Sequence, residues 1–220
     1  MDKKRVGVIH TFLYSVEDLK KLFAELVPEV EMINIIDDSL LKEVLANGGV
    51  TPAVVRRISN YAKELEALGC SMILNQCSSV GEAADIAAKT VSIPVAKVDG
   101  PMAKKAISLG KRIGVVATAY TTMGPSVRLI ENTAKELGAE VLVTPCFAEG
   151  AYEALLNEGN KKKHDEILMA TIDKACSEHD VICLAQGSML SLVEVCKTKS
   201  VPVLHSFRSG VAQIRDILAL

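Results

Sequence analysis

The residue types most able to do chemistry stand directly after apolar runs of the sequence. In Gln76-Cys77-Ser78-Ser79 a thiol precedes a predicted helix, and the positive end of a helix dipole favours the thiolate. Ser78 and Ser79, with free backbone N–H groups, are placed to hold an anion such as a carboxylate. The alternative interpretation is a small buried thiol followed by serines that cap the helix.

A second hydroxyl-rich segment follows another apolar run and consists of Thr118, Ala119, Tyr120, Thr121 and Thr122. Its hydroxyl groups can bind carboxylate oxygens, and the Tyr120 ring can close a site over a ligand. Ordinary helix capping is the alternative. Because its hydroxyl groups exceed what one helix cap needs, we favour a substrate-binding role.

Two histidines, His10 and His205, end apolar runs and are candidates for general acids or bases near neutral pH. A structural role is the alternative for each. Asp99 can orient a partner, although capping of the next helix is the simpler interpretation. His164 and His179 lie in charged helical stretches, where we expect exposure to solvent.

These residues need a scaffold, and the sequence predicts an α/β fold with mostly parallel strands, because short β-branched runs alternate with longer amphipathic stretches. The predicted strands are Val6–Ile9, Val30–Ile36, Ser71–Leu74, Pro94–Val98, Ile113–Ala117, Val141–Thr144, Val181–Leu184 and Pro202–Leu204. The predicted helices are Val16–Leu26, Pro52–Leu68, Gly81–Thr90, Pro101–Leu109, Pro125–Leu137, Gly150–Leu156, His164–Ser177, Ser191–Cys196 and Ser209–Leu218.

An internal repeat divides the chain. Three segments return in the same order about 110 residues later: Lys4–Ile9 as Lys111–Val116, Ile73–Ser79 as Cys183–Met189, and Ser92–Val95 as Ser200–Val203. We predict two similar α/β halves, residues 1–98 plus 206–220 and residues 99–205, related by a pseudo-twofold axis with the ligand cleft between them.

Ligands of open parallel sheets sit outside the carboxyl ends of the strands, so the segments after the strands should line this cleft. Those segments are His10-Thr11, Cys77-Ser78-Ser79, Asp99-Gly100, Thr118–Thr122, Cys146, Gly187-Ser188 and His205-Ser206.

Composition and motifs exclude several classes of protein. A net charge of −2, 4% aromatic residues and no Trp argue against a nucleic-acid partner. No apolar run reaches the ~18 residues of a membrane span, and no signal peptide is recognisable, so we expect a cytoplasmic protein. The six cysteines form no CxxC pair, and phosphate-binding glycine motifs, a GxSxG elbow and metal-ligand spacings are missing. We therefore expect neither a metal nor a cofactor.

Three features resemble the aspartate/glutamate/hydantoin racemase superfamily, which also includes maleate isomerase and arylmalonate decarboxylase. They are Leu74–Ser79 with its counterpart in the second half, Val115–Thr118 followed by Thr121-Thr122, and Pro202-Val203. The resemblance covers essentially the whole chain. It implies a site between the halves, no cofactor, a homodimer, and cysteines on opposite faces of a carbanion-like intermediate whose carboxylate is held by hydroxyls and backbone amides.

The sequence departs from the two-cysteine pattern of that superfamily. Cys77 matches the first cysteine, whereas the repeat places Gly187, or Gln186 when Met189 is the anchor, at the second. Cys183 lies within a buried strand and is not counted as the replacement. The residues predicted to bind substrate are His10, Thr11, Ser78, Ser79, Thr118, Tyr120, Thr121, Ser188 and His205.

Three functions fit this pattern. The first is a racemase or isomerase of a small carboxylate, with Cys77 as one acid/base and another group, such as His10 or His205, as the second. The second is a decarboxylase or lyase that uses Cys77 alone. The third is a non-catalytic protein that binds a small anion.

Overall fold

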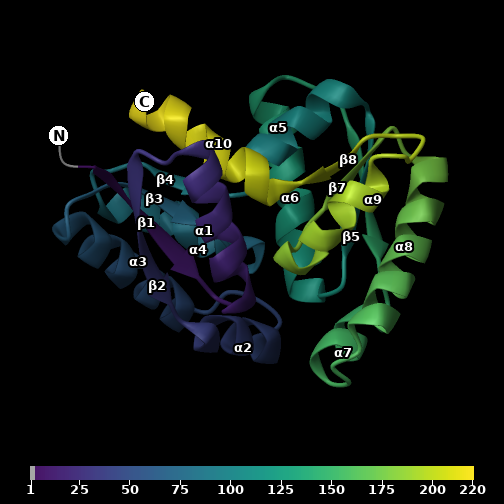
Figure 1. Ribbon diagram of the computed structural model, residues 1–220, viewed down its shortest axis with the longest axis horizontal. Coiled ribbons are helices and arrows are strands. Elements are labelled where there is room, and N and C mark those ends of the chain that lie inside the picture. The colour runs from purple at the N-terminus through teal and green to yellow at the C-terminus, as the bar shows by residue number, and fades with distance from the viewer. Residues whose placement is uncertain (1–2) are drawn as a thin grey trace. The chain divides into compact units, whose positions relative to one another are not determined.

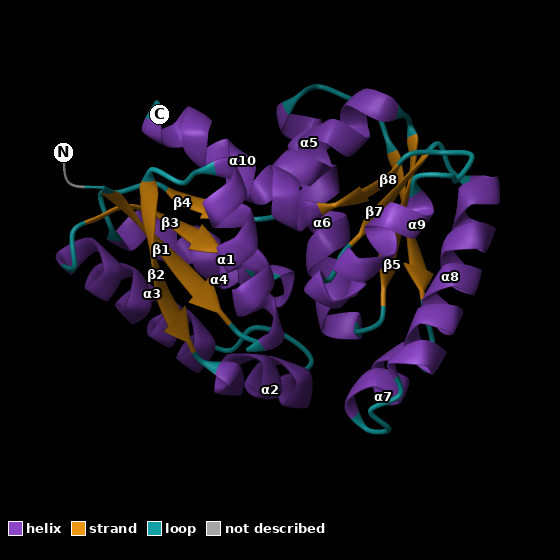
Figure 2. Ribbon diagram, in the orientation of Figure 1, coloured by secondary structure: helices purple, strands orange, loops and turns teal. Residues whose placement is uncertain are grey.

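The computed structural model describes residues 3–220 and separates the chain into two compact units. Unit 1 contains the residues up to Gly100 together with Phe207–Leu220, and unit 2 contains Pro101–Ser206. Each unit is a four-stranded parallel sheet with helices on both faces (Figure 2). The prediction of two similar α/β halves is confirmed. Among the described residues, no helix is both long and apolar enough to cross a membrane.

Unit 1 has the strand order β2-β1-β3-β4. Its strands are β1 (Lys4–His10), β2 (Val30–Ile36), β3 (Cys70–Asn75) and β4 (Val95–Lys97). Its helices are α1 (Tyr14–Leu26), α2 (Asp38–Asn47), α3 (Pro52–Ala67), α4 (Gly81–Ala87), α10 (Ser206–Leu218) and the 3-10 helices η1 (Ser78–Val80) and η2 (Ala88–Thr90).

The two faces of the unit 1 sheet are covered by different helices. On one face, α2, α3, η1 and α4 enclose a core that includes Leu40, Ile58, Ile73 and Val80, and Cys77 packs against it. Helices α1 and α10 lie over the other face (Figure 1).

Helix α10 is fixed to the rest of unit 1 by polar contacts and by a close approach of its backbone. Arg208 bonds to Glu25 of α1 at 2.6 and 3.0 Å. Gln213 donates to the carbonyl of Lys97 at 3.0 Å. A Cβ placed on Gly210 would lie 2.3 Å from the carbonyl oxygen of Val98, so only glycine allows this approach.

Helix α2 was not predicted, because only Leu40 and Val44 on it are buried and its apolar pattern is short. Its start is capped by the Asp37 side chain, which accepts the Ser39 backbone N–H at 3.0 Å. Its end is marked by Gly48 in the left-handed region, with φ 68°.

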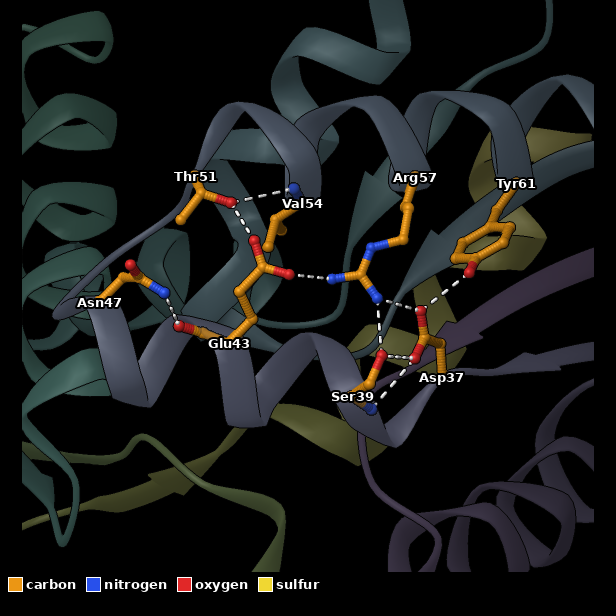
Figure 3. A network of polar contacts seen from close by, with 8 residues as sticks. All are labelled: Asp37, Ser39, Glu43, Asn47, Thr51, Val54, Arg57 and Tyr61. Atoms are coloured by element: carbon orange, nitrogen blue, oxygen red, sulfur yellow. Dashed lines mark hydrogen bonds and ion pairs between the residues drawn. The ribbon is translucent and has the colours of Figure 1, made fainter.

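A polar network joins α2 to α3 and to the end of β2 (Figure 3). The Arg57 guanidinium bonds to Asp37 at 2.9 Å and to Glu43 at 2.5 Å, and the Tyr61 hydroxyl also donates to Asp37, at 2.8 Å. Since α2 contacts η1, this network holds in place a helix that supports the Cys77 loop.

Unit 2 repeats the arrangement with the strand order β6-β5-β7-β8. Its strands are β5 (Arg112–Ala117), β6 (Leu142–Phe147), β7 (Val181–Leu184) and β8 (Val203–His205). Its helices are α5 (Gly100–Leu109), α6 (Tyr120–Glu136), α7 (Ala151–Leu156), α8 (Lys161–Glu178), α9 (Val193–Cys196) and the 3-10 helix η3 (Gly187–Leu192).

The alternation of side chains along β5 and β7 divides the core of unit 2 into two layers. Ile113, Val115 and Cys183 pack with α5 and α6, whereas Val116 and Leu184 pack with α8, η3 and α9.

Helix α6 begins earlier than the predicted start at Pro125. It starts at Tyr120 and contains Pro125 in its interior, so Thr121 and Thr122 belong to its first turn. The prediction placed the proline at the first helical position, where its missing N–H is harmless, but it lies in the second turn.

Candidate functional site

Cys77 lies just beyond the carboxyl end of β3, in extended backbone (φ −115°, ψ 120°) at the start of η1. The buried Asn75 side chain fixes this bend, because its Nδ2 donates to the carbonyl of Cys77 at 2.9 Å. Register places Asn75 opposite Ile9 of β1, so Thr11 follows β1 on the same side of the sheet. The strand ends therefore bring a thiol, an amide and a hydroxyl together.

The thiol of Cys77 favours its protonated form. Burial raises its pKa, while the Thr11 hydroxyl, both the hydroxyl and the N–H of Ser79, and the N–H of Val80 act in the opposite direction. We expected a helix start to favour the thiolate, but η1 has only three residues and offers a weak dipole. Cys77 is thus a proton donor with thiolate-stabilising groups already beside it.

Several buried polar atoms in the described part of the chain have no partner within the protein, and three of them lie at the ends of β1 and β3. They are His10 Nδ1, Asn75 Oδ1 and Gln76 Oε1. Buried polar atoms without hydrogen bonds destabilise a fold, so a concentration of them indicates a place for a polar ligand.

His10 is buried and its Nε2 lies 2.8 Å from Asn34 Oδ1. Burial lowers the pKa of His10, so the ring is neutral at pH 7. With Nε2 donating to Asn34, the unpartnered Nδ1 carries the lone pair and is available as a base.

Ser78 and Asp99 are joined across the ends of β3 and β4. Ser78 Oγ donates to Asp99 Oδ2 at 2.5 Å. Burial raises the pKa of Asp99. The carboxyl group therefore belongs to the surroundings of the Cys77 loop, beyond the capping role expected for it.

In unit 2 the place after β7 is taken by Gln186, in extended backbone (φ −135°, ψ 144°) at the start of η3. Its Oε1 accepts from the N–H of Thr118 at 2.5 Å and from the Thr118 hydroxyl at 3.0 Å. His205 Nε2 lies 3.1 Å from the Gln186 carbonyl oxygen, and burial lowers the pKa of His205 to about 4.

Strand register decides which residue of unit 2 corresponds to Cys77. Gly7 pairs with Ile73 in unit 1, and its repeat counterpart Gly114 pairs with Ile182 in unit 2. Counting forward from Ile73 and Ile182 equates Cys77 with Gln186 rather than with Gly187, which begins η3 as Ser78 begins η1.

The remaining predicted residues of unit 2 lie in the first turns that follow β5 and β7. Tyr120 stacks on Phe147 with ring centroids 3.9 Å apart and is 74% exposed. Thr121 Oγ1 is buried without a partner within the protein, whereas Ser188 is partly buried in η3.

Two histidines differ from expectation, since His164 and His179 are both buried. His164 precedes the buried Leu168 by one helical turn, so it shares the inner face of α8 despite its charged neighbours in sequence. Cys183 lies deep in the core, and burial raises its pKa to about 12, which makes it unsuited to exchange protons. Within residues 3–220, no group of three or more His, Cys, Asp or Glu side chains could hold a metal ion.

A family model of Asp/Glu/hydantoin racemases matches residues 13–214. This chain belongs to the Asp/Glu/hydantoin racemase family. The match spans both units and both strand-end loops described above, so the resemblance inferred from the sequence is confirmed. No curated protein is similar enough in sequence to be matched to this racemase-family chain.

Solved structures share its fold at low sequence identity. A Yersinia pestis protein provisionally named an Asp/Glu racemase aligns with a TM-score of 0.77 and 17% identity, over 99% of this chain and 100% of that one. A glutamate racemase isoform from Bacillus anthracis aligns with a TM-score of 0.71 and 17% identity, over 100% of this chain and 83% of that one. Unliganded arylmalonate decarboxylase aligns with a TM-score of 0.59 and 16% identity, over 99% of this chain and 92% of that one. Such identities show a common fold only.

Sequence reasoning missed Asn75 and Asn34 as parts of the site and undervalued Asp99. The available signal was an amide inside an otherwise apolar strand. Asn75 ends the buried run of β3, and Asn34 interrupts the apolar residues of β2. A buried amide needs hydrogen-bond partners, and here those partners are the Cys77 backbone and His10.

Proposed function

We propose that this chain is a cofactor-independent racemase or isomerase of a small carboxylate, such as an amino acid or a related acid, with Cys77 as one acid/base. The observation that carries the proposal is the group of buried polar atoms without partners at the ends of β1 and β3, directly before Cys77 in the chain after β3, in a member of this family. A ligand that pairs with these atoms would lie within reach of the thiol.

The protonation states of two groups support this assignment. Racemisation by two groups requires one proton acceptor and one proton donor in the same enzyme form. At neutral pH the raised pKa of Cys77 keeps its proton in place, and the lowered pKa of His10 keeps its imidazole neutral. We therefore propose Cys77 as the acid and His10 as the base in one direction, with the roles exchanged in the other.

The groups beside Cys77 support the reverse step. After the thiol gives up its proton, the Thr11 hydroxyl and the donors of Ser79 can stabilise the sulfur anion. Charge that develops on the substrate carboxylate needs fixed donors, and we propose the hydroxyls after the strands for that task.

A single-cysteine decarboxylase or lyase is the second candidate, and Gln186 favours it. This residue corresponds to Cys77 by register, and Thr118 binds its Oε1. An amide does not exchange protons near neutral pH, whereas protonation of a carbanion on one face after loss of carbon dioxide needs only one acid.

Proton NMR in D2O separates these candidates. Wild type, Cys77→Ala and His10→Gln would be incubated with a panel of α-amino, α-hydroxy and dicarboxylic acids. A racemase exchanges the α-hydrogen and forms the opposite enantiomer, and both variants lose this activity. Loss of carbon dioxide with deuterium incorporation that depends on Cys77 but not on His10 would establish the second candidate. Turnover by Cys77→Ala at the wild-type rate would overturn both.

A further inference from the structure

Asp99 lies buried at the carboxyl end of β4 and bonds to the loop that carries Cys77. Ser78 Oγ donates to Asp99 Oδ2 at 2.5 Å, and Asp99 is only 4% exposed. Ser78 directly follows the thiol in sequence and is itself partly buried. A carboxyl group in this place controls which hydrogen bonds the Ser78 hydroxyl can still offer to a ligand.

We propose that Asp99 is a positioning residue that determines whether Ser78 donates or accepts a hydrogen bond toward a ligand at Cys77. The proposal rests on the proposed function in one respect, since it takes the Cys77 loop as the place where a carboxylate binds. It goes further by coupling the binding of that carboxylate to proton uptake at Asp99.

The coupling of carboxylate binding to proton uptake follows from the hydrogen bonds that Ser78 can form in each protonation state of Asp99. An ionised Asp99 accepts a hydrogen bond from the Ser78 hydroxyl. Ser78 Oγ then presents only lone pairs to a ligand, and these repel a carboxylate. A protonated Asp99 donates to Ser78 Oγ and frees the Ser78 hydrogen for a carboxylate oxygen. The negative charge of ionised Asp99 would also repel a ligand anion in these buried surroundings. A carboxylate should therefore bind together with one proton.

The charged groups around Asp99 allow it to take up and release a proton. Burial raises its pKa, and the Ser78 hydrogen bond and the Lys97 charge oppose that effect. The Lys97 ammonium is already paired with Asp85 of α4 at 2.8 Å, which reduces its influence on Asp99. The residues of η1 contribute no titratable side chain.

Helix α10 also packs against the end of β4, through Gly210 and Val98. Its first charged residue, Arg208, is paired with Glu25 of α1. Its Gln213 is neutral and donates to a backbone carbonyl. The charge of Asp99 is therefore opposed mainly by Lys97.

Two alkylating agents of nearly equal size test the proposal without a known substrate. Iodoacetate carries a carboxylate and iodoacetamide a neutral amide, and both react with the thiolate. The ratio of their rate constants at Cys77, measured by peptide mapping, therefore cancels the ionisation of the thiol. In the wild type this ratio should rise about fivefold or more as the pH falls from about 9 to about 5 and Asp99 takes up its proton.

Three variants complete the experiment. In Asp99→Asn the ratio should lose its dependence on pH, because the amide does not titrate. In Ser78→Ala the ratio should be lower than in the wild type at acid pH and should rise less as the pH falls, because only the charge of Asp99 still changes. Asp85→Asn removes a carboxylate that pairs with Lys97 and raises the pKa of Asp99, so its ratio should keep the rise of the wild type but show it at lower pH.

A flat wild-type ratio, or an Asp99→Asn profile equal to the wild type, would overturn the proposal. Circular dichroism establishes that each variant is folded. If Asp99→Asn does not fold, the pH dependence of the ratio in the wild type is compared with that in Ser78→Ala, and equal profiles would overturn the proposal. If the alkylation profiles are as expected but no α-hydrogen exchange depends on Cys77, the proposed function alone fails.

Discussion

Thr118 directs two donors at one atom of Gln186, with its backbone N–H 2.5 Å and its hydroxyl 3.0 Å from Oε1. Thr11 holds the corresponding place in unit 1, and its hydroxyl favours the ionised form of Cys77. The same strand-end turn therefore supports an amide oxygen in one unit and a sulfur in the other.

The first prediction concerns Thr11. Replacement by valine keeps the shape of the side chain but removes the donor, so the pKa of Cys77 should rise. Alkylation of Cys77 by iodoacetamide at about pH 8 should slow about threefold or more. Thr11→Ser should react like the wild type. Thr118→Val is the matched control in unit 2 and should leave Cys77 unaffected; equal slowing in both valine variants would refute the role of Thr11.

The second prediction concerns Gln186. Gln186→Ala leaves the buried Thr118 N–H without its partner and should lower the free energy of unfolding by about 1–3 kcal/mol. Gln186→Glu keeps an oxygen acceptor at the same place and should lower the free energy of unfolding clearly less than Gln186→Ala does at neutral pH. Urea unfolding followed by circular dichroism measures both. An alanine variant as stable as the wild type would show that the pair of hydrogen bonds contributes nothing.

The third prediction is a loss of stability in mild acid. Burial lowers the pKa of His205 from 6.5 to about 4, so between these values the unfolded chain binds a proton that the folded chain does not. The free energy of unfolding should therefore fall as the pH drops from about 6.5 to about 4, by about 3 kcal/mol from this residue.

The buried His10 has a lowered pKa and adds to the same trend. His205→Gln should remove the contribution of His205 and give a shallower pH profile in urea unfolding. A slope unchanged by this substitution would mean that His205 does not titrate differently in the two states.

The fourth prediction concerns the packing of α10. Gly210→Ala places a Cβ against the carbonyl of Val98, where only the backbone could move away, and should destabilise the fold by about 1–3 kcal/mol or more. Gly124→Ala is the matched helical control, because the atom nearest its Cβ would be Nη1 of the Arg128 side chain, at 3.1 Å, rather than backbone. The control should lower the melting temperature much less than Gly210→Ala does. Equal melting temperatures for the two variants would contradict the assigned contact.

The fifth prediction concerns Arg57. Arg57→Met leaves the partly buried carboxylates of Asp37 and Glu43 without their shared cation and should destabilise the fold by about 1–2 kcal/mol. Arg57→Lys should recover only part of this loss, since one ammonium cannot span both acceptors. Arg57→Met should lower the free energy of unfolding by less in a Glu43→Gln background than in the wild type. If the effects of the two substitutions on that free energy simply add, they do not share a network.

The strands were predictable because buried parallel strands are continuous β-branched runs. Val30–Ile36 and Val181–Leu184 have the predicted bounds, and the others differ by a few residues. Helix α2 escaped detection because its stability comes from the Asp37 cap and the Arg57 network, and neither produces an apolar period.

The chemical environment of the site was less accessible from sequence. The position of Cys77 after β3 was expected, but its protonated thiol depends on burial that only packing reveals. The identity of its counterpart rested on an ambiguous alignment, and strand register selects Gln186. His164 looked exposed from its neighbours, although its spacing from Leu168 already indicated the buried face.

The return of α10 to unit 1 imposes an order on the synthesis of the protein. The helix packs against the end of β4 about 110 residues earlier in the chain, so unit 1 lacks one of the two helices on that face of its sheet until residues 206–218 have been synthesised. Unit 2 is complete by Ser206, before that helix exists. Unit 1 should therefore stay incomplete, with part of one sheet face covered by α1 alone, until unit 2 and α10 have been translated.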